Sequence, residues 1–162
     1  PVMYIDDRWL YSQEDYLPEV KNIELVKQKP KIIEKGSDLT IVASSYSTLL
    51  AKNAISYLKK EGIYCELIDL RVINPINYDL ILKSICKTKR FIVVDGGWKT
   101  CGLASEIISS VVEKLDPNIL LSKPINLSLK NCPAPSSNVL EKEYYLTEQD
   151  IVNSLERELL NN

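Results

Sequence analysis

The sequence predicts an α/β fold, a three-layer α/β/α sandwich around a mostly parallel (mixed) sheet of about five strands. From Asp38 onward, short apolar runs alternate with segments of helical spacing, and their connections are short. The runs are rich in β-branched residues and apolar throughout, as strands covered on both faces are. The chain has 162 residues, 45% of them hydrophobic and 26% charged, which suffices for one ordinary domain with a buried core.

Two strands and two helices are expected first. "DLTIVAS" (38–44) and "YCELIDL" (64–70) predict buried parallel strands, and "SYSTLLAKNAISYLKKEG" (45–62) predicts a helix between them. The serines before this helix can cap its start, and Gly62 can end it. Its inward positions are Leu50, Ala51, Ala54, Ile55 and Leu58. "NPINYDLILKSICKTK" (74–89) predicts a second helix capped by Asn77, with Leu80, Ile81 and Ile85 inward.

Two further strands and two further helices follow. "RFIVVD" (90–95) predicts a third strand, which Gly96 and Gly97 turn into a third helix. That helix has an apolar stripe of Leu103, Ile107, Val111 and Leu115. "PINLSL" (124–129) predicts a fourth strand, and residues 131–146 read as a loop. Thr147 can cap the last helix in a capping box with Asp150. The inward stripe of this helix is Ile151, Leu155 and Leu159.

Residues 1–37 have a different pattern. "PVMYI" suggests a short strand, and the mixed charge and prolines that follow suggest a linker on a surface. Trp9 and Tyr11 are large side chains in such a segment, so we expect them to anchor it. We therefore divide the chain into residues 1–37 and a regular domain of residues 38–162. Because the sequence begins at Pro1, we expect it to be a fragment of a longer protein.

Composition excludes several classes of function. A net charge of -2 without a basic cluster argues against nucleic acid, and no apolar run reaches the roughly 20 residues of a membrane span. The absence of histidine excludes a Ser–His–Asp triad and histidine-ligated metal within this chain. Four cysteines without a C-x-x-C pair predict neither a metal site nor a disulfide framework, and favour a cytoplasmic location. Cys101 lacks a histidine partner, so an inert turn residue is favoured over a reactive thiol.

The glycine-rich turn "DGGWKTCG" (95–102) joins a strand to a helix, which is also the layout of a phosphate-binding loop. It matches neither G-x-G-x-x-G nor a Walker A loop, since Trp98 stands where a backbone would approach a pyrophosphate and Leu103 follows Gly102. We therefore interpret Gly96, Gly97 and Gly102 as structural. The glycines permit the corner, and Gly102 permits close packing of the helix.

Several blocks in one order resemble a known family. They are "LRVINPIN" (70–77), "KTKR" (87–90) and "VDGGWKTCGLASEI" (94–107), with "KKEGIYCELIDLR" upstream and "CPAPSSNVLEKEYYLTEQDIV" downstream. Together they resemble the C-terminal domain of the β-subunit of 2-oxo acid dehydrogenase E1 components (pyruvate, branched-chain or acetoin type), within the transketolase superfamily. By this resemblance, residues 1–37 are the end of a preceding pyrimidine-binding domain plus a linker, and residues 38–162 are the transketolase C-terminal-like domain.

The resemblance implies a place in an enzyme but no catalytic residue. Enzymes of this family use thiamine diphosphate and Mg to decarboxylate a 2-oxo acid oxidatively, and they pass the acyl group to a lipoyl acyltransferase. Their cofactor site lies in the upstream domain and the α-subunit, so we assign no catalytic, cofactor-binding or metal residue to this chain and expect it to be inactive and cofactor-free alone. The implied partners are the pyrimidine-binding domain, the E1 α-subunit and the E2 acyltransferase. The resemblance does not indicate which 2-oxo acid is the substrate.

Departures from the family pattern concern the partners. "GWKT" (97–100) replaces "GWPQ", Leu50 stands where many relatives have histidine, and Lys123 stands where some have an acid that contacts the acyltransferase. By resemblance we expect a homodimer, with Trp98, Tyr144 and Tyr145 as candidate interface residues, since aromatic residues are favoured at interfaces. Two alternatives stay open. The chain could be the C-terminal domain of a transketolase or deoxyxylulose-phosphate synthase, or a stand-alone, non-catalytic binding module of the same fold.

Overall fold

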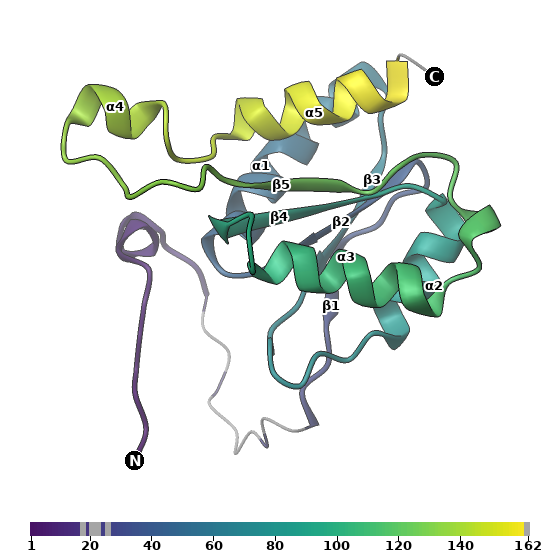
Figure 1. The fold of residues 1–162 in the computed structure, drawn as a ribbon, viewed down its shortest axis with the longest axis horizontal. Coiled ribbons are helices and arrows are strands. Elements are labelled where there is room, and N and C mark those ends of the chain that lie inside the picture. Colours follow the sequence, from purple (N-terminus) through teal and green to yellow (C-terminus); the bar gives the residue numbers. More distant parts are fainter. Residues whose placement is uncertain (17–18, 20–23, 25–26, 161–162) are drawn as a thin grey trace.

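The computed structural model describes residues 1–16, 19, 24 and 27–160, and it contains one five-stranded sheet (Figure 1). Its strands are β1 (Lys31–Glu34), β2 (Leu39–Ala43), β3 (Cys65–Asp69), β4 (Phe91–Trp98) and β5 (Ile125–Leu129). They lie in the order β1-β3-β2-β4-β5. The pairs β2–β3, β2–β4 and β4–β5 are parallel, and β1 runs antiparallel to β3. The sheet is therefore mixed and mostly parallel, as the sequence predicts.

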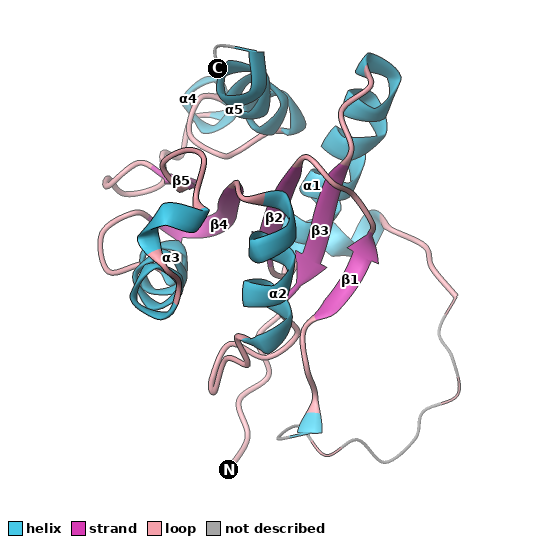
Figure 2. Cartoon of the chain, turned by 90° about the vertical axis from the view of Figure 1, so that its right-hand side faces the viewer, coloured by secondary structure: helices cyan, strands magenta, loops and turns pink. Residues whose placement is uncertain are grey.

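Helices cover both faces of this sheet (Figure 2). The longer ones are α1 (Tyr46–Leu58), α2 (Asp79–Thr88), α3 (Leu103–Lys114) and α5 (Glu148–Leu160), and α4 (Asn138–Lys142) is short. Short 3-10 turns are η1 (Arg8–Ser12), η3 (Lys59–Glu61) and η4 (Pro117–Ile119). Buried residues of α1 and α5 form one core cluster with the sheet, and those of α2 and α3 form the other. The predicted three-layer sandwich is confirmed.

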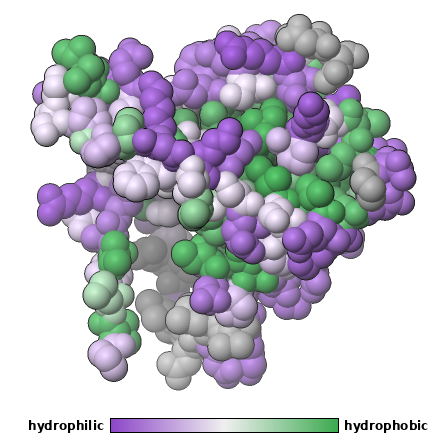
Figure 3. Space-filling model, in the orientation of Figure 1, coloured by the Kyte–Doolittle hydropathy of each residue, from purple (hydrophilic) through white to green (hydrophobic). Residues whose placement is uncertain are grey.

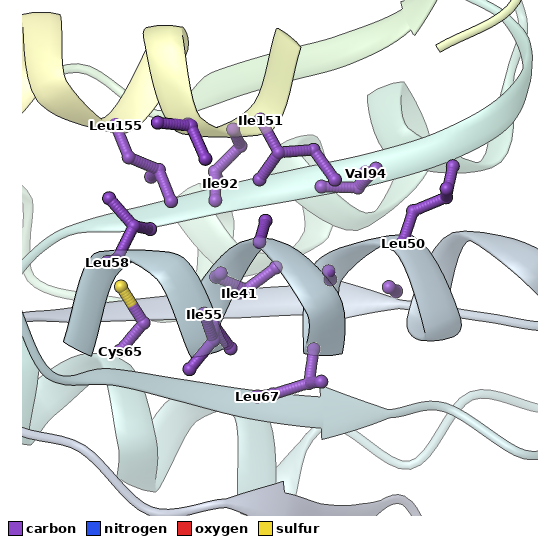
Figure 4. Close-up of a cluster of buried hydrophobic side chains, with 14 of the residues drawn as sticks. Ile41, Leu50, Ile55, Leu58, Cys65, Leu67, Ile92, Val94, Ile151 and Leu155 are labelled. Carbon is purple, nitrogen blue, oxygen red and sulfur yellow. The ribbon is translucent and has the colours of Figure 1, made fainter. Parts of the chain in front are cut away.

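The apolar patterns in the sequence become these two cores. On one face, Leu50 and Leu58 of α1 and Ile151 of α5 point toward the strands (Figure 4). They meet inward side chains of the three central strands, which are Ile41, Leu67, Ile92 and Val94. Each fully buried aliphatic side chain of this kind contributes roughly 1.5–3 kcal/mol relative to an exposed one. The inward stripes predicted for α1, α2 and α3 hold, and on α5 Ile151 and Leu155 are fully buried while Leu159 is half-buried.

The structure corrects the reading of the N-terminal segment. Val2 and Ile5 are 99% and 82% exposed, and "PVMYI" forms no strand. Conversely, Lys31–Glu34 forms β1 inside the stretch expected to be a linker, because it pairs with the edge of β3. The sheet therefore begins before Asp38. The other part of that expected linker lies partly outside the described residues.

The predicted helix ends are confirmed in part. Gly62 has the left-handed φ of 81° that ends the helical segment after α1, and the Thr147 N–H donates to Asp150 Oδ2 at 2.8 Å in a capping box. Asn77 Oδ1 accepts from the Asp79 N–H at 3.2 Å, so Asn77 caps α2 from one residue before its N-cap position. The serine cap of α1 is wrong, because Ser45 has a φ of 53° and its side chain makes no capping hydrogen bond.

A buried polar network joins α2 to the amino ends of the strands. Thr40 of β2 shares hydrogen bonds of 2.7 Å with Ser84 and Thr88, and Ser84 donates to Glu66 Oε1 of β3 at 2.6 Å. Lys87 pairs with the other oxygen of Glu66. Burial raises the pKa of Glu66, but the hydrogen bonds from Lys87 and Ser84 outweigh burial, so that the net pKa of this carboxyl lies below its ordinary value. This network is structural, since it lies at the edge opposite the carboxyl ends of the strands.

Candidate functional site at the carboxyl edge of the sheet

The topology singles out one crevice. β2 and β4 are neighbours, but the chain leaves β2 for α1 on one face and leaves β4 for α3 on the other. Such a switch point opens a crevice beyond the carboxyl ends of two parallel strands, and open α/β sheets bind ligands there. The residues just after these strand ends are therefore the candidate site.

A carboxylate within β4, that of Asp95, holds the turn that follows the strand. Asp95 is 9% exposed; its Oδ1 accepts from the Gly97 N–H at 2.9 Å and its Oδ2 from the Ala104 N–H at 3.1 Å. Ala104 lies in the first turn of α3, where free N–H groups and the helix dipole favour an anion. The Asp95 carboxylate thus takes the place that a phosphate would have at this helix. The resemblance of the turn to a phosphate cradle is explained by this internal cap.

Two of the three structural glycines differ from expectation. Gly96 and Gly97 lie within β4, which continues to Trp98, so they do not turn the strand into α3. Among the described residues the glycine with a positive φ is Gly62, so Gly97 does not have the left-handed conformation that would require glycine. Gly102 is required by close approach. A Cβ there would lie 1.9 Å from the Trp98 carbonyl oxygen, so the tight return of the chain into α3 requires glycine at position 102.

The start of α1 forms the other wall of the crevice. Ser47 is 6% exposed and lines a cavity of about 460 Å³, together with Ser44, Ser45 and Gly96. A Cβ on Gly96 would lie 3.7 Å from Ser47 Oγ, so the two residues face each other across the crevice. An adjoining cavity of about 1100 Å³ shares Trp9, Tyr46, Leu50, Glu141, Tyr145 and Leu146 with it. A solvent-accessible recess therefore lies at the switch point.

Aromatic side chains line and brace this recess. Trp9 of η1 packs edge-to-face on Tyr46 at 5.0 Å and on Tyr145 at 4.7 Å between ring centroids. Trp98 Nε1 donates to the Tyr144 hydroxyl at 2.9 Å, and that hydroxyl donates to the Cys132 carbonyl at 2.9 Å. The expectation that Trp9 and Tyr11 anchor the N-terminal segment is confirmed for Trp9. Tyr11 is 70% exposed, and its hydroxyl donates to Asp6 in the same segment.

The candidate interface residues differ in exposure. Trp98 is 52% exposed, whereas Tyr144 is 7% exposed and Tyr145 is half-buried. Tyr144 supports the segment that carries α4, which has no buried residue and projects from the body (Figure 3). Val139 and Leu140 of α4 are 74% and 58% exposed. The role of these residues in an interface stays a prediction.

Sequence reasoning missed two polar residues of this edge, Asp95 as a cap and Ser47 as a wall. Asp95 was visible as the acid that ends the predicted strand, but its two backbone partners are two and nine residues away, and the second depends on the return of the chain into α3. Among the described residues, no group of three or more His, Cys, Asp or Glu could hold a metal ion, and no helix there could span a membrane. Cys86, Cys101 and Cys132 are exposed, and burial raises the pKa of the Cys65 thiol to about 12.

The sheet order and the crevice define an open, mostly parallel α/β domain. The family described as "Transketolase, C-terminal domain" matches residues 28–151, and the chain belongs to this family. Over 159 residues it is 34% identical to the β-subunit of the pyruvate dehydrogenase E1 component of Rickettsia felis. Over 162 residues it is 30% identical to the mitochondrial β-subunit of the pyruvate dehydrogenase E1 component of Rattus norvegicus. These matches cover 97% and 98% of this chain but 48% and 45% of the relatives, so the chain spans about half their length.

Solved structures agree with the fold. A split-gene transketolase, described as an inactive β4 tetramer, matches with a TM-score of 0.71 at 24% identity, over 89% of this chain and 47% of the other. A 2-oxoglutarate:ferredoxin oxidoreductase from Magnetococcus marinus matches with a TM-score of 0.54 at 14% identity, over 82% of this chain and 20% of the other. At these identities the likeness concerns the fold alone.

The described residues do not fit thiamine diphosphate with its magnesium ion at the glycine turn. Asp95 already accepts from the Ala104 N–H in the first turn of α3 and from the Gly97 N–H in β4, and its negative charge would repel the phosphates.

Proposed function

We propose that this chain is the C-terminal, non-catalytic part of the β-subunit of a thiamine diphosphate-dependent 2-oxo acid dehydrogenase E1 component. The observation that carries the proposal is the match over 97% of this chain to about half of such a β-subunit. In this proposal the remaining polypeptides of the enzyme bind the cofactor and magnesium, and this domain helps to hold the assembly together. A cytoplasmic location, expected from the cysteine usage, belongs to the same proposal.

The surface supports a role in assembly. α4 buries none of its residues, while Tyr144 and Trp98 fix its base to β4 through the 2.9 Å hydrogen bond. Val139 and Leu140 are thus neighbouring exposed apolar residues on a braced support, where another protein could cover them. We propose that a second copy of the chain covers them in an isologous contact that includes Trp98, and that the E1 α-subunit and the E2 acyltransferase bind the assembled dimer.

Light scattering tests the dimer. We expect the purified chain to have twice the monomer mass of 18.4 kDa, and a double variant with Val139→Glu and Leu140→Glu to be monomeric. Val112→Glu is the matched control, because Val112 is also exposed, at 43%, but lies on α3 and should leave the dimer intact. A parent chain that stays monomeric over the whole accessible concentration range would contradict the proposed contact.

The alternatives make different predictions. A stand-alone binding module would not bind an E1 α-subunit, whether or not the module dimerises. A domain of an E1 β-subunit must be part of an assembly with an α-subunit. The transketolase alternative rests on fold likeness, while the relatives at 30% identity or more described above are pyruvate dehydrogenase β-subunits. Co-purification with a pyruvate dehydrogenase α-subunit and the remaining half of the β-subunit separates these classes.

A further inference from the structure

We propose that Cys101 and Cys132 form a reversible disulfide when the chain meets a peroxide or glutathione disulfide. The two cysteines are far apart in the sequence, and no local motif joins them. The structure brings their segments together at the carboxyl ends of two neighbouring strands. The inference does not depend on the proposed function, because the bond is measured on this chain alone.

The register of the sheet gives the two cysteines matching positions. β4 and β5 are parallel neighbours, and Trp98 is paired with Leu129 where their ladder ends. Cys101 lies three residues after Trp98, and Cys132 lies three residues after Leu129. Neighbouring strands lie about 4.8 Å apart, and the Cα atoms of a disulfide are usually about 4.4–6.8 Å apart. The two segments therefore leave the sheet at a separation that suits a disulfide.

Hydrogen bonds hold the two segments together beyond the end of the ladder. The Thr100 N–H donates to Asn131 Oδ1 at 3.3 Å, and the side-chain amide of Asn131 donates back to the Thr100 hydroxyl. Thr100 directly precedes Cys101, and Asn131 directly precedes Cys132. The contact therefore lies next to the two thiols.

A second contact joins the same segments independently of the first. The Tyr144 hydroxyl accepts from Trp98 Nε1 and donates to the Cys132 carbonyl, both at 2.9 Å. On the other side, the return into α3 is tight, because a Cβ on Gly102 would lie 1.9 Å from the Trp98 carbonyl oxygen. Cys101 lies inside this return. The backbone at both cysteines is therefore held in place, and bond formation depends on rotation of the side chains.

The two thiols are accessible to an oxidant. Cys101 and Cys132 are exposed, and exposed side chains change rotamer within nanoseconds. Cys65 is buried, and Cys86 lies in the last turn of α2, the helix that is bonded to the amino ends of the strands. Among the four cysteines of the chain, Cys101 and Cys132 are therefore the pair that oxidation can join.

The oxidant balances the reaction. With hydrogen peroxide, one thiolate attacks a peroxide oxygen, the O–O bond breaks, and a sulfenic acid and water form. The other thiolate attacks the sulfenic sulfur, the S–O bond breaks, and the disulfide forms with release of a second water. With glutathione disulfide, the products are the protein disulfide and two molecules of glutathione. Transient bonds of this kind occur in reducing compartments, so the pair agrees with the absence of a disulfide framework.

Peptide mapping tests the bond. The purified chain is oxidised at low concentration, unfolded in excess alkylating agent, digested with trypsin without reduction and analysed by mass spectrometry. We expect the tryptic peptides 100–114 and 131–142 to be joined and Cys86 to be alkylated, and dithiothreitol should release both peptides. Cys101→Ser and Cys132→Ser should each abolish the bond within the chain. Cys86→Ser is the matched control, which should form the bond as the parent does.

The melting temperature is a second readout. The bond would close a loop that contains α3 and β5, and such a cross-link stabilises a fold mainly by restricting the unfolded chain. The oxidised parent should therefore melt about 5–15 °C above its reduced form, while the melt of Cys101→Ser should not change on oxidation. Three results would overturn the proposal: no joined peptide, joined peptides only between different molecules, or an oxidised form that melts below the reduced one.

Discussion

Removing the Asp95 carboxylate should destabilise the domain, because this side chain holds the return from β4 into α3. In Asp95→Ala, the N–H of Ala104 loses its partner at 3.1 Å and the N–H of Gly97 loses its partner at 2.9 Å. Ala104 is fully buried, so its unpaired donor costs about 1–3 kcal/mol, and the half-buried donor of Gly97 adds about 0.5–1 kcal/mol. The free energy of unfolding should fall by about 1.5–4 kcal/mol in total.

For a chain of this size each kcal/mol lowers the melting temperature by roughly 2–4 °C, so a decrease of roughly 3–16 °C is expected. Asp95→Asn keeps the shape and one acceptor oxygen, and it should lose about half as much. Asp116→Ala is the control, since Asp116 also accepts a backbone N–H, from Asn118 at 2.9 Å, but on the exposed turn η4, where the cost should stay near 0.5 kcal/mol. Calorimetric melts of these three variants and the parent chain measure the decreases in melting temperature. If Asp95→Ala melted no lower than Asp116→Ala, the capping role of Asp95 would be refuted.

Three other changes should show themselves in stability or reactivity. Gly102→Ala should cost about 1–3 kcal/mol in a denaturant melt, because its Cβ would meet the Trp98 carbonyl oxygen at 1.9 Å, while Gly96→Ala should stay within about 0.5 kcal/mol; equal melts would contradict the close approach. The pKa of Glu66 is lowered in the folded state, so the contribution of this carboxylate to stability is complete above its ordinary pKa of 4.5 and is lost as the pH falls through the folded pKa. Glu66→Gln should therefore lose less stability than the parent chain does below about pH 4.5. An unchanged slope of stability against pH would contradict this. With its pKa raised to about 12 by burial, Cys65 should resist alkylation at neutral pH until the chain unfolds, whereas Cys86, Cys101 and Cys132 react at once; mass spectrometry of the alkylated peptides distinguishes them.

The regular part of the fold could be predicted from the sequence, because the spacing of apolar residues there matches the faces that the structure buries. The runs at β2, β3 and β4 are apolar throughout since both of their faces are covered, and the stripes of α1 and α3 repeat at helical spacing. Thr147 and Asp150 were readable as a cap, because both partners of a capping box lie within three residues. Local patterns of this kind need no knowledge of the rest of the chain.

What the sequence could not show depends on distant partners. Lys31–Glu34 has only four residues and becomes a strand because β3 offers it an edge. "PVMYI" has the composition of a strand, but no strand of the described chain pairs with it. Gly97 looked like a turn residue, yet β4 continues through it, and the real constraint falls on Gly102 through the Trp98 carbonyl. The crevice itself arises from the strand order, which places Ser47 and Gly96 opposite each other.

The central claim, that this domain supports a thiamine diphosphate enzyme without holding its cofactor, is tested most directly by one calorimetric titration. Thiamine diphosphate with Mg²⁺ is added to the chain alone, and to the chain reconstituted with an E1 α-subunit and the remaining half of the β-subunit. The account predicts no saturable heat for the chain alone, and saturable binding with decarboxylation of a 2-oxo acid for the reconstituted assembly. Micromolar binding by the chain alone would contradict it.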